Sequence, residues 1–264
     1  MAEEIRINKF LSDAGVCSRR EADKYIEEGR VTVNGVPAEA GQKVTAADAV
    51  VFDGQRVSAK GPKRVVLAVN KPRGVVCTTA EFKGEKNIVD LVNYPERIYP
   101  VGRLDKTSEG LILMTNRGDL VNQVLKSSRE HEKEYVVSVD KPVTEEMLDV
   151  FRNGVYLEDL QQTTKPCRCW ISGEMVFHLV LTQGLNRQIR RMCEAQGLRV
   201  RRLKRVRIMG IQLGDIPLGG YRELTESEVA GLMNTETPKN GGGRKSAGIS
   251  RADHRSRRVV KVRR

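Results

Sequence analysis

The sequence predicts an α+β fold whose main domain is built on a largely antiparallel mixed sheet. Two observations predict it: short runs rich in β-branched residues alternate with short helical stretches, and clusters of Gly, Pro and polar residues separate them. The strand-like runs lie at residues 65–70, 111–115, 135–139 and 176–182, and the helical stretches at 88–92 and 120–126. A smaller module precedes this domain and a basic segment follows it.

Residues 1–60 form the smaller module, which we expect to begin with two helices. Apolar residues recur at helical spacing over residues 7–14, and Gly15 provides a stop. Ser18 and Glu21 have the spacing of a capping box, so a second helix begins there and ends at Gly29.

A β-hairpin is predicted after the second helix. Val31 and Val33 lead into Asn34-Gly35, a pair typical of two-residue hairpin turns. The outer face of the second helix carries Arg19, Arg20 and Lys24. This face is either ordinary solvated surface or a site for phosphate groups.

The rest of the chain divides at its composition changes. Residues 58–64 have the Gly, Pro and charge content of a linker, so we place the main domain at residues 61–235. Residues 236–264 consist largely of Gly, Ser, Lys and Arg, which predicts a disordered basic tail.

The charge balance indicates the class of partner. The net charge is +12, and residues 238–264 contribute ten Lys or Arg against one Asp. Such a basic chain favours nucleic acid over a membrane as its partner. No apolar run approaches membrane-spanning length and no apolar signal segment opens the chain, so we expect a cytoplasmic protein without a membrane partner.

Several kinds of chemistry find no support. Five scattered cysteines without a secretory signal predict reduced thiols. Cys167 and Cys169 with His178 are too few for a metal site, so we expect the two cysteines on a strand and no bound metal. The chain has neither a phosphate-binding loop nor a nucleophile elbow, which argues against a nucleotide cofactor and against Ser-His-Asp catalysis.

Asp105 is the foremost candidate for catalysis. It lies in a glycine-bracketed loop between Arg103 and Lys106. Local sequence alone favours an aspartate that forms a turn or caps a helix. The neighbouring cations favour the ionised carboxylate, which can attack an electron-poor sugar carbon or serve as a base. Both interpretations are open on these residues alone.

Two later segments also carry reactive or charged side chains. Tyr135 is either a packed strand residue or a ring that stacks on a nucleobase and whose hydroxyl can move a proton. Residues 184–194 predict an amphipathic helix with Asn186 as N-cap. Its basic face, formed by Arg187, Arg190 and Arg191, is either solvated or bound to a polyanion.

The segment Asn70-Lys71-Pro72-Arg73-Gly74 predicts a strand that ends in a Pro/Gly turn. We interpret it as chiefly structural, with Lys71 as scaffold or RNA contact. This segment, the loop Gly102–Gly110, the strand Lys133–Val137 and the helix Asn186–Met192 together resemble the RsuA/RluB/RluE/RluF family of ribosomal RNA pseudouridine synthases. Residues 6–11, 17–22 and 31–35 resemble the αL-type RNA-binding domain, which also occurs in a small-subunit ribosomal protein.

The resemblance covers nearly everything from residue 5 to about residue 233, and it implies isomerisation of a uridine in ribosomal RNA within a basic cleft, without a cofactor. Asp105 would be the nucleophile or, in the competing view, a base that removes a sugar proton. Tyr135 would stack and assist proton transfer, and Arg190 would hold Asp105 in a bidentate pair. The resemblance implies structural roles for Asn70, Lys71, Pro72 and Gly74, and RNA contacts for Arg103, Leu104, Lys106, Asn186, Arg187, Gln188, Arg191, Arg19, Arg20 and Lys24.

Residues 87–90, 131–135 and 140–144 look most like the RluF branch, which acts on 23S ribosomal RNA. The implied partners are ribosomal RNA or ribosomal assembly intermediates, bound by a monomer. Three alternatives are open: another ribosomal RNA uridine, as in RluB-like or RsuA-like enzymes, a non-catalytic ribosome-assembly factor, and a glycosidase-like hydrolase. Glu109 has no independent case as the second carboxylate that a retaining hydrolase uses.

Overall fold

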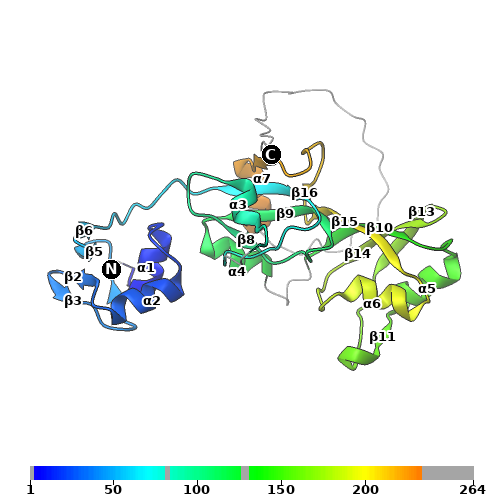
Figure 1. Ribbon diagram of the computed structural model, residues 1–264, viewed down its shortest axis with the longest axis horizontal. Coiled ribbons are helices and arrows are strands. Elements are labelled where there is room, and N and C mark those ends of the chain that lie inside the picture. The colour runs from blue at the N-terminus through cyan, green and yellow to red at the C-terminus, as the bar shows by residue number, and fades with distance from the viewer. Residues whose placement is uncertain (1–2, 81–83, 126–130, 234–264) are drawn as a thin grey trace. The chain divides into compact units, whose positions relative to one another are not determined.

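The computed structural model describes residues 3–80, 84–125 and 131–233 (Figure 1). The chain divides into two compact units. The first comprises Met1–Val65, Tyr94–Ile98 and Asn116–Gly118, and the second comprises Val66–Asn93, Tyr99–Thr115 and Asp119–Arg264. The tail expected at 236–264, and the last residue of the helix expected at 120–126, lie outside the described residues.

The first unit contains two helices and short strands. A four-stranded sheet has the order β3-β2-β5-β6, and β1 pairs separately with β4. The elements are β1 Ile5–Arg6, α1 Ile7–Asp13, α2 Arg19–Glu27, β2 Val31–Val33, β3 Val36–Pro37, β4 Lys43–Val44, β5 Val50–Phe52 and β6 Gln55–Arg56.

Local sequence signals explain this unit, and the predicted helices and hairpin are confirmed. The Ser18 hydroxyl accepts from the Glu21 N–H at 3.2 Å while the Glu21 carboxylate accepts from the Ser18 N–H at 2.6 Å, which completes the capping box of α2. Asn34 and Gly35 both have positive φ, as the β2–β3 turn requires. Apolar side chains of both helices and of β2 pack into one core.

The second unit is built on a nine-stranded mixed sheet of order β13-β14-β10-β15-β9-β7-β17, with β8 paired to β9 and β16 to β15. Its elements are β7 Val66–Lys71, α3 Ile88–Val92, β8 Tyr99–Val101, β9 Glu109–Thr115, α4 Gly118–Leu125, β10 Lys133–Val139, α5 Glu145–Asn153, β11 Tyr156–Leu157, β12 Gln162–Thr163, β13 Arg168–Gly173, β14 Val176–Leu181, α6 Gln188–Ala195, β15 Val200–Ile208, β16 Ile211–Gln212, β17 Tyr221–Glu223 and α7 Glu226–Met233.

Most of the strand pairs in this sheet are antiparallel, as predicted, and β9 with β15 is the parallel pair. The parallel pair brings Gly110 beside Arg205. One core cluster joins β7 and β9 to α4 and α7, and Phe151 of α5 packs on Phe177 of β14 at 5.6 Å between ring centroids. Figure 1 shows α5 and α6 near the end of the sheet that carries β13 and β14.

The two cysteines of the Cys167-x-Cys169 pattern lie where β13 begins. Both thiols donate to backbone carbonyls of α5, Cys167 to Phe151 and Cys169 to Leu148. Within the described ranges, no group of three or more His, Cys, Asp or Glu side chains is arranged to hold a metal ion. No helix in this part of the chain is long and apolar enough to cross a membrane.

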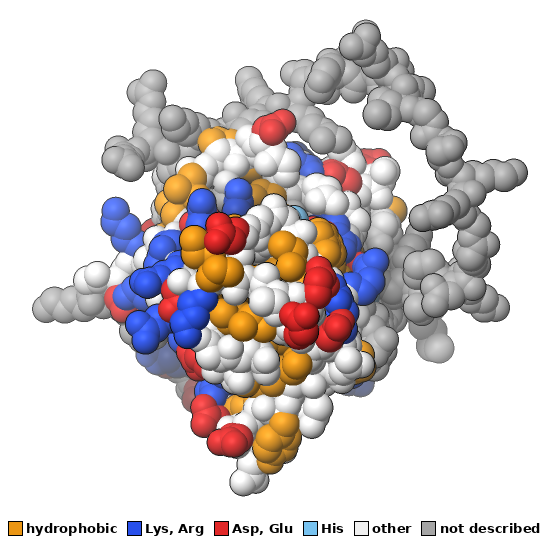
Figure 2. Space-filling view, turned by 90° about the vertical axis from the view of Figure 1, so that its right-hand side faces the viewer, with side chains coloured by type: hydrophobic (Ala, Val, Ile, Leu, Met, Phe, Trp, Pro, Cys, Tyr) orange, Lys and Arg blue, Asp and Glu red, His pale blue; other side chains and the backbone are white. Residues whose placement is uncertain are grey.

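The surface at this end of the second unit is mixed in character. Figure 2 shows Lys and Arg side chains gathered on one side of this face, with carboxylates and apolar side chains elsewhere. Tyr156 and Trp170 are among the exposed large apolar residues. The ring of Trp170 stacks on that of His178 at 4.8 Å between centroids.

Candidate active site

A pocket of about 570 Å³ lies within the second unit. Five segments far apart in the sequence form it: the loop between β8 and β9, the end of α4, the start of β10, the connection from β14 into α6, and β15. Its lining includes Gly102, Arg103, Leu104, Asp105, Ser108, His131, Lys133, Tyr135, Gln183, Asn186, Arg187, Gln188, Arg190, Leu203 and Arg205.

The loop between β8 and β9 presents Asp105 to this pocket. Two backbone hydrogen bonds hold the loop: the Ser108 N–H donates to the Asp105 carbonyl at 3.0 Å, and the Gly74 N–H donates to the Lys106 carbonyl at 2.7 Å. The Asp105 side chain is half-buried. Among the described residues, no hydrogen-bond donor occupies its carboxylate, so both oxygens are available to a substrate.

The turn after β7 contacts the loop that carries Asp105 through the hydrogen bond from the Gly74 N–H to the Lys106 carbonyl. Lys71 is fully buried, and its Nζ donates to the carbonyls of Pro72 at 3.0 Å and Val75 at 2.8 Å. Burial lowers the pKa of Lys71, while the Asp105 carboxylate acts in the opposite direction. Asn70 donates to the Ile216 carbonyl at 2.7 Å. The motif at residues 70–74 therefore braces the segment that carries Asp105.

Strand β10 supplies Tyr135 and Lys133 to one face of the sheet. Tyr135 is 9% exposed, and its hydroxyl has no hydrogen-bond partner among the described residues. The Lys133 Nζ donates to the His131 carbonyl at 3.3 Å. Burial lowers the pKa of Lys133, and the positive charge of Arg205 lowers it further. Two chemically active groups thus reach the pocket from adjacent inward positions of one strand.

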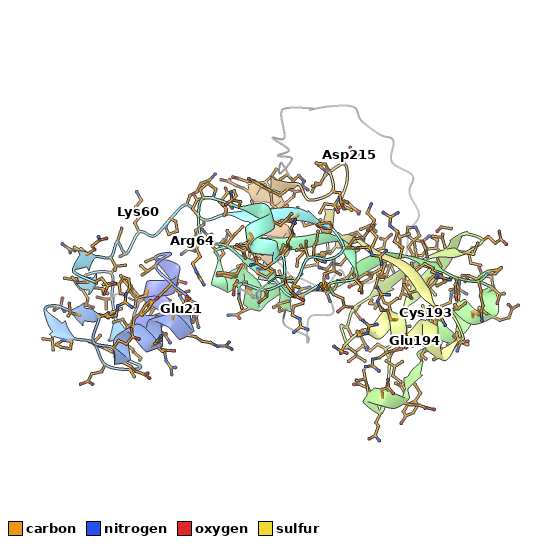
Figure 3. All side chains as sticks on the ribbon, in the orientation of Figure 1. Glu21, Lys60, Arg64, Cys193, Glu194 and Asp215 are labelled. Atoms are coloured by element: carbon orange, nitrogen blue, oxygen red, sulfur yellow. The ribbon has the colours of Figure 1, made fainter. Side chains whose placement is uncertain are left out.

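Helix α6 begins one residue later than predicted, and Asn186 is not its N-cap. Arg187 occupies the N-cap position with φ +51°, and no side chain caps the helix there. The Gln188 side chain instead accepts from the Leu185 N–H at 3.1 Å and so folds the loop before the helix. The predicted faces are otherwise confirmed: Ile189, Met192 and Cys193 are buried. Figure 3 labels Cys193 and its exposed neighbour Glu194 on this helix.

Arg190 does not form the bidentate pair with Asp105 that was expected. Its guanidinium donates to the carbonyls of Thr107 at 3.4 Å and Val200 at 3.5 Å. Burial lowers the pKa of Arg190, the charge of Arg187 lowers it further, and Asp105 raises it. The prediction was wrong because the guanidinium reaches the backbone of the loop that bears Asp105 and leaves the carboxylate itself open.

Three groups of expected RNA-contacting residues occupy different places. Arg103, Leu104, Asn186, Arg187 and Gln188 line the pocket. Outside its lining, the Lys106 ammonium pairs with Glu85 at 2.7 Å and Arg191 pairs with Asp159. In the first unit, Arg19, Arg20 and Lys24 are exposed on α2, the helix whose Glu21 is labelled in Figure 3.

The sequence interpretation assigned no role to Ser108, Gln183 or Arg205, which the pocket wall contains together with Arg190. Ser108 Oγ, Gln183 Nε2, Arg190 Nε and Arg205 Nη2 are buried in the pocket wall without hydrogen-bond partners among the described residues. Buried polar atoms of folded proteins are nearly always paired, so this concentration marks a wall prepared for a polar ligand. The sequence pattern could have indicated Arg205. Leu203 and Arg205 occupy alternate, inward-facing positions of β15, which places a cation on an otherwise apolar face of the strand.

A family model described as RNA pseudouridylate synthase matches residues 65–195, and an S4 domain model matches residues 5–50. The chain therefore belongs to the pseudouridine synthase family and is an isomerase.

Particular members of this family are close relatives. The dual-specificity RNA pseudouridine synthase RluF of Escherichia coli K12 is 48% identical over 94% of this chain and 87% of its own length. The ribosomal large subunit pseudouridine synthase B of Bacillus subtilis is 38% identical over 86% of this chain and 95% of its own. A crystal structure of a pseudouridylate synthase superimposes with a TM-score of 0.64 at 27% identity, covering 86% of this chain and 99% of that chain.

Proposed function

We propose that the protein converts a specific uridine of 23S ribosomal RNA into pseudouridine, with Asp105 as the group that attacks the sugar. The observation that carries this proposal is the Asp105 carboxylate, held half-buried in a pocket wall with five cationic side chains, among them Arg103 and Arg187, and with no donor from the described residues on its oxygens.

The large-subunit target rests on the relatives. RluF of Escherichia coli shares nearly half of the aligned residues, and the Bacillus subtilis relative is named for the large ribosomal subunit. The name of the first relative also states a dual specificity, so the substrate test includes total cellular RNA as well as ribosomal RNA. Such RNAs reside in the cytoplasm, which is where we place the activity.

The reaction is an intramolecular rearrangement. The target uridine leaves its stack at a cost of roughly a few kcal/mol and enters the pocket. The C1′–N1 bond breaks while Asp105 attacks C1′ or removes a sugar proton, the base turns over, and a C1′–C5 bond forms. As the C1′–C5 bond forms, the Asp105–C1′ bond breaks and frees the carboxylate, or, in the elimination route, Asp105 returns the proton to the sugar. The C5 proton leaves and N1 gains a proton, so no external group or electron acceptor is consumed.

Two further side chains act on this sequence of steps. The ring of Tyr135 packs against the displaced base, and its hydroxyl assists proton transfer from C5. Arg190 acts through the loop backbone at Thr107, which fixes the direction of the Asp105 carboxylate. The exposed cations Arg103 and Arg187 bind phosphates on either side of the target.

The experiment compares the wild-type protein with Asp105→Asn on total RNA and on ribosomal RNA that lack pseudouridine. Carbodiimide-dependent primer extension maps each new pseudouridine as a stop. Asp105→Asn should lose roughly a thousandfold or more in rate while its RNA affinity and melting temperature stay unchanged. Asp215→Asn is the matched control, because Asp215 is exposed on a loop (Figure 3) and lies outside the pocket lining.

Each alternative gives a distinct result. RNA binding by both proteins with no stop on any RNA would favour a non-catalytic assembly factor. Free uracil in the reaction would indicate a hydrolase. A stop in small-subunit RNA would retain the chemistry and reject the large-subunit target.

A further inference from the structure

Arg205 is a buried cation in the pocket, and within the described part of the chain no carboxylate pairs with it. It is 5% exposed, and its Nε donates to the Leu111 carbonyl at 2.7 Å. Nη2 has no hydrogen-bond partner among the described residues. A buried guanidinium normally occurs with a carboxylate that offsets its desolvation, so a cation in this state is unusual in a purely structural role.

The strand register places Arg205 beside the proposed catalytic groups. In the antiparallel β10–β15 pair, Tyr135 lies directly opposite Arg205, so both side chains share the pocket face of the sheet. In the parallel pair, Gly110 lies on the other side of Arg205. A Cβ on Gly110 would overlap the Arg205 carbonyl oxygen, so the strands can approach this closely only because residue 110 is glycine.

Other charges around Arg205 leave a local excess of positive charge. Lys71 is buried and Lys133 half-buried nearby, and the charge of Arg205 adds to the burial that lowers the pKa of both. Of the acidic groups, Glu109 is already paired with Arg202 at 2.6 Å, which leaves Asp105. Exposed cations on the pocket rim can bind phosphates that carry charge before the reaction begins. Arg205 and the half-buried Lys133 line the pocket itself and face a uracil base that is neutral when it enters.

Negative charge appears on that base when the C1′–N1 bond breaks. The bonding electron pair goes to N1, and the anion is shared between N1 and the ring carbonyl oxygens. This holds whether Asp105 bonds to C1′ or removes the C2′ proton, because N1 departs with the electron pair in both routes. Fixed donors in a buried site stabilise developing charge of this kind.

We propose that Arg205 is a catalytic residue that donates a hydrogen bond from its unpaired guanidinium nitrogen to a carbonyl oxygen of the target uracil, and that it stabilises the uracil anion formed between C1′–N1 cleavage and C1′–C5 bond formation. The charge is discharged when C5 bonds to C1′, C5 loses its proton and N1 is protonated. This role rests on the proposed isomerisation.

The test measures tritium release from ribosomal RNA labelled at C5 of uridine, with wild type, Arg205→Gln, Arg205→Ala and the control Arg201→Gln. Arg201 is an exposed cation on the same strand and does not line the pocket. Arg205→Gln should lose roughly a hundredfold to a thousandfold in kcat. Its KM, its RNA affinity and the salt dependence of that affinity should match wild type. Added guanidinium ion should restore at least part of the kcat of Arg205→Ala and nothing to Asp105→Asn.

Three outcomes would overturn the proposal. A kcat of Arg205→Gln within threefold of wild type would exclude a catalytic role. A raised KM with a shallower salt dependence at full kcat would assign Arg205 to a phosphate. A folded Arg205→Ala protein that guanidinium does not rescue would make its role structural.

Melting temperatures separate folding from chemistry. If the Gln and Ala variants do not fold, Arg205→Lys decides: it keeps the charge but cannot reproduce the planar fork. A tenfold loss of kcat at unchanged RNA affinity then supports the proposal, and an undiminished kcat overturns it. Failure of the proposed function is distinguishable, because the wild type itself would then release no tritium.

Discussion

Lys71 shows how one buried residue supports the site without entering it. Its side chain is fully buried and bonds two carbonyls of the turn at residues 72–75. The same turn holds the Asp105 loop through the Gly74 N–H and the Lys106 carbonyl. The buried Lys71 therefore helps to place the carboxylate of Asp105, which lies more than thirty residues later in the sequence. Burying the lysine costs free energy.

Replacing Lys71 with methionine should lower the free energy of unfolding by about 2–4 kcal/mol, because the buried Val75 carbonyl and the partly buried Pro72 carbonyl lose their donor. Urea-induced unfolding measures this change. Lys86→Met, at an exposed position, is the control and should remain within about 0.5 kcal/mol of wild type. An equally small change for Lys71→Met would show that the turn holds itself without the lysine.

Besides its apolar packing in the core cluster, helix α7 is bonded to the sheet through the carboxylate of Glu228. Glu228 accepts from Arg222 of β17 through both oxygens, at 2.8 and 2.9 Å. It also accepts from the Thr225 N–H while the Thr225 hydroxyl accepts from the Glu228 N–H, which is a capping box at the start of the helix. These bonds, with Arg222 first, lower the pKa of Glu228 from 4.5 to about 2.

This attachment should depend on pH in a defined window. Because the folded-state pKa is below the unfolded value, the unfolded chain binds more protons between pH 4.5 and about 2, and stability falls as the pH falls through that range. Above pH 4.5 the contribution of Glu228 is complete. Urea-unfolding midpoints of wild type and Glu228→Gln should differ at pH 7 and converge near pH 2. Glu226→Gln on the same helix is the control, and a constant difference at all pH values would contradict the assignment.

At the scale of the whole molecule, each of the two units carries a group of cationic side chains, and we propose that both groups bind RNA. The catalytic unit has the cationic pocket, and the first unit has the exposed cations of α2. The first 60 residues carry nine Lys or Arg against ten Asp or Glu, so their position and not their number makes such a face. The S4 domain model matches this part of the chain.

The combined variant Arg19→Gln, Arg20→Gln and Lys24→Gln should therefore weaken RNA binding and reduce the slope of log affinity against log salt by about two. Turnover at saturating RNA should not change, because the pocket is untouched. Filter binding over a salt series measures the slope. Lys43→Gln, Arg56→Gln and Lys60→Gln remove the same charge elsewhere in the unit, and an equal effect from them would indicate general attraction in place of a defined face.

Local signals determined the elements that the sequence predicted correctly. Helical spacing, the Ser18–Glu21 capping box and the Asn34-Gly35 turn act over a few residues, so they are visible without the fold. The alternating apolar runs gave the strands and the α+β class for the same reason. The segments that bear Asp105, Tyr135 and Arg190 were also found from sequence, and the pocket brings all three together. Their catalytic roles remain predictions.

Only the tertiary structure decided which partners these side chains meet. Arg190 was expected to pair with the Asp105 carboxylate, but it donates to the Thr107 carbonyl instead. Asn186 is not the N-cap of α6, because the Gln188 side chain holds the preceding loop in another conformation. The place of Arg205 depends on the pairing of β15 with β9 across more than ninety residues. Such pairing follows from the packing of the whole sheet, which no local sequence pattern encodes. Residue spacing was therefore enough to identify the candidate reactive residues, but it did not determine which groups they contact.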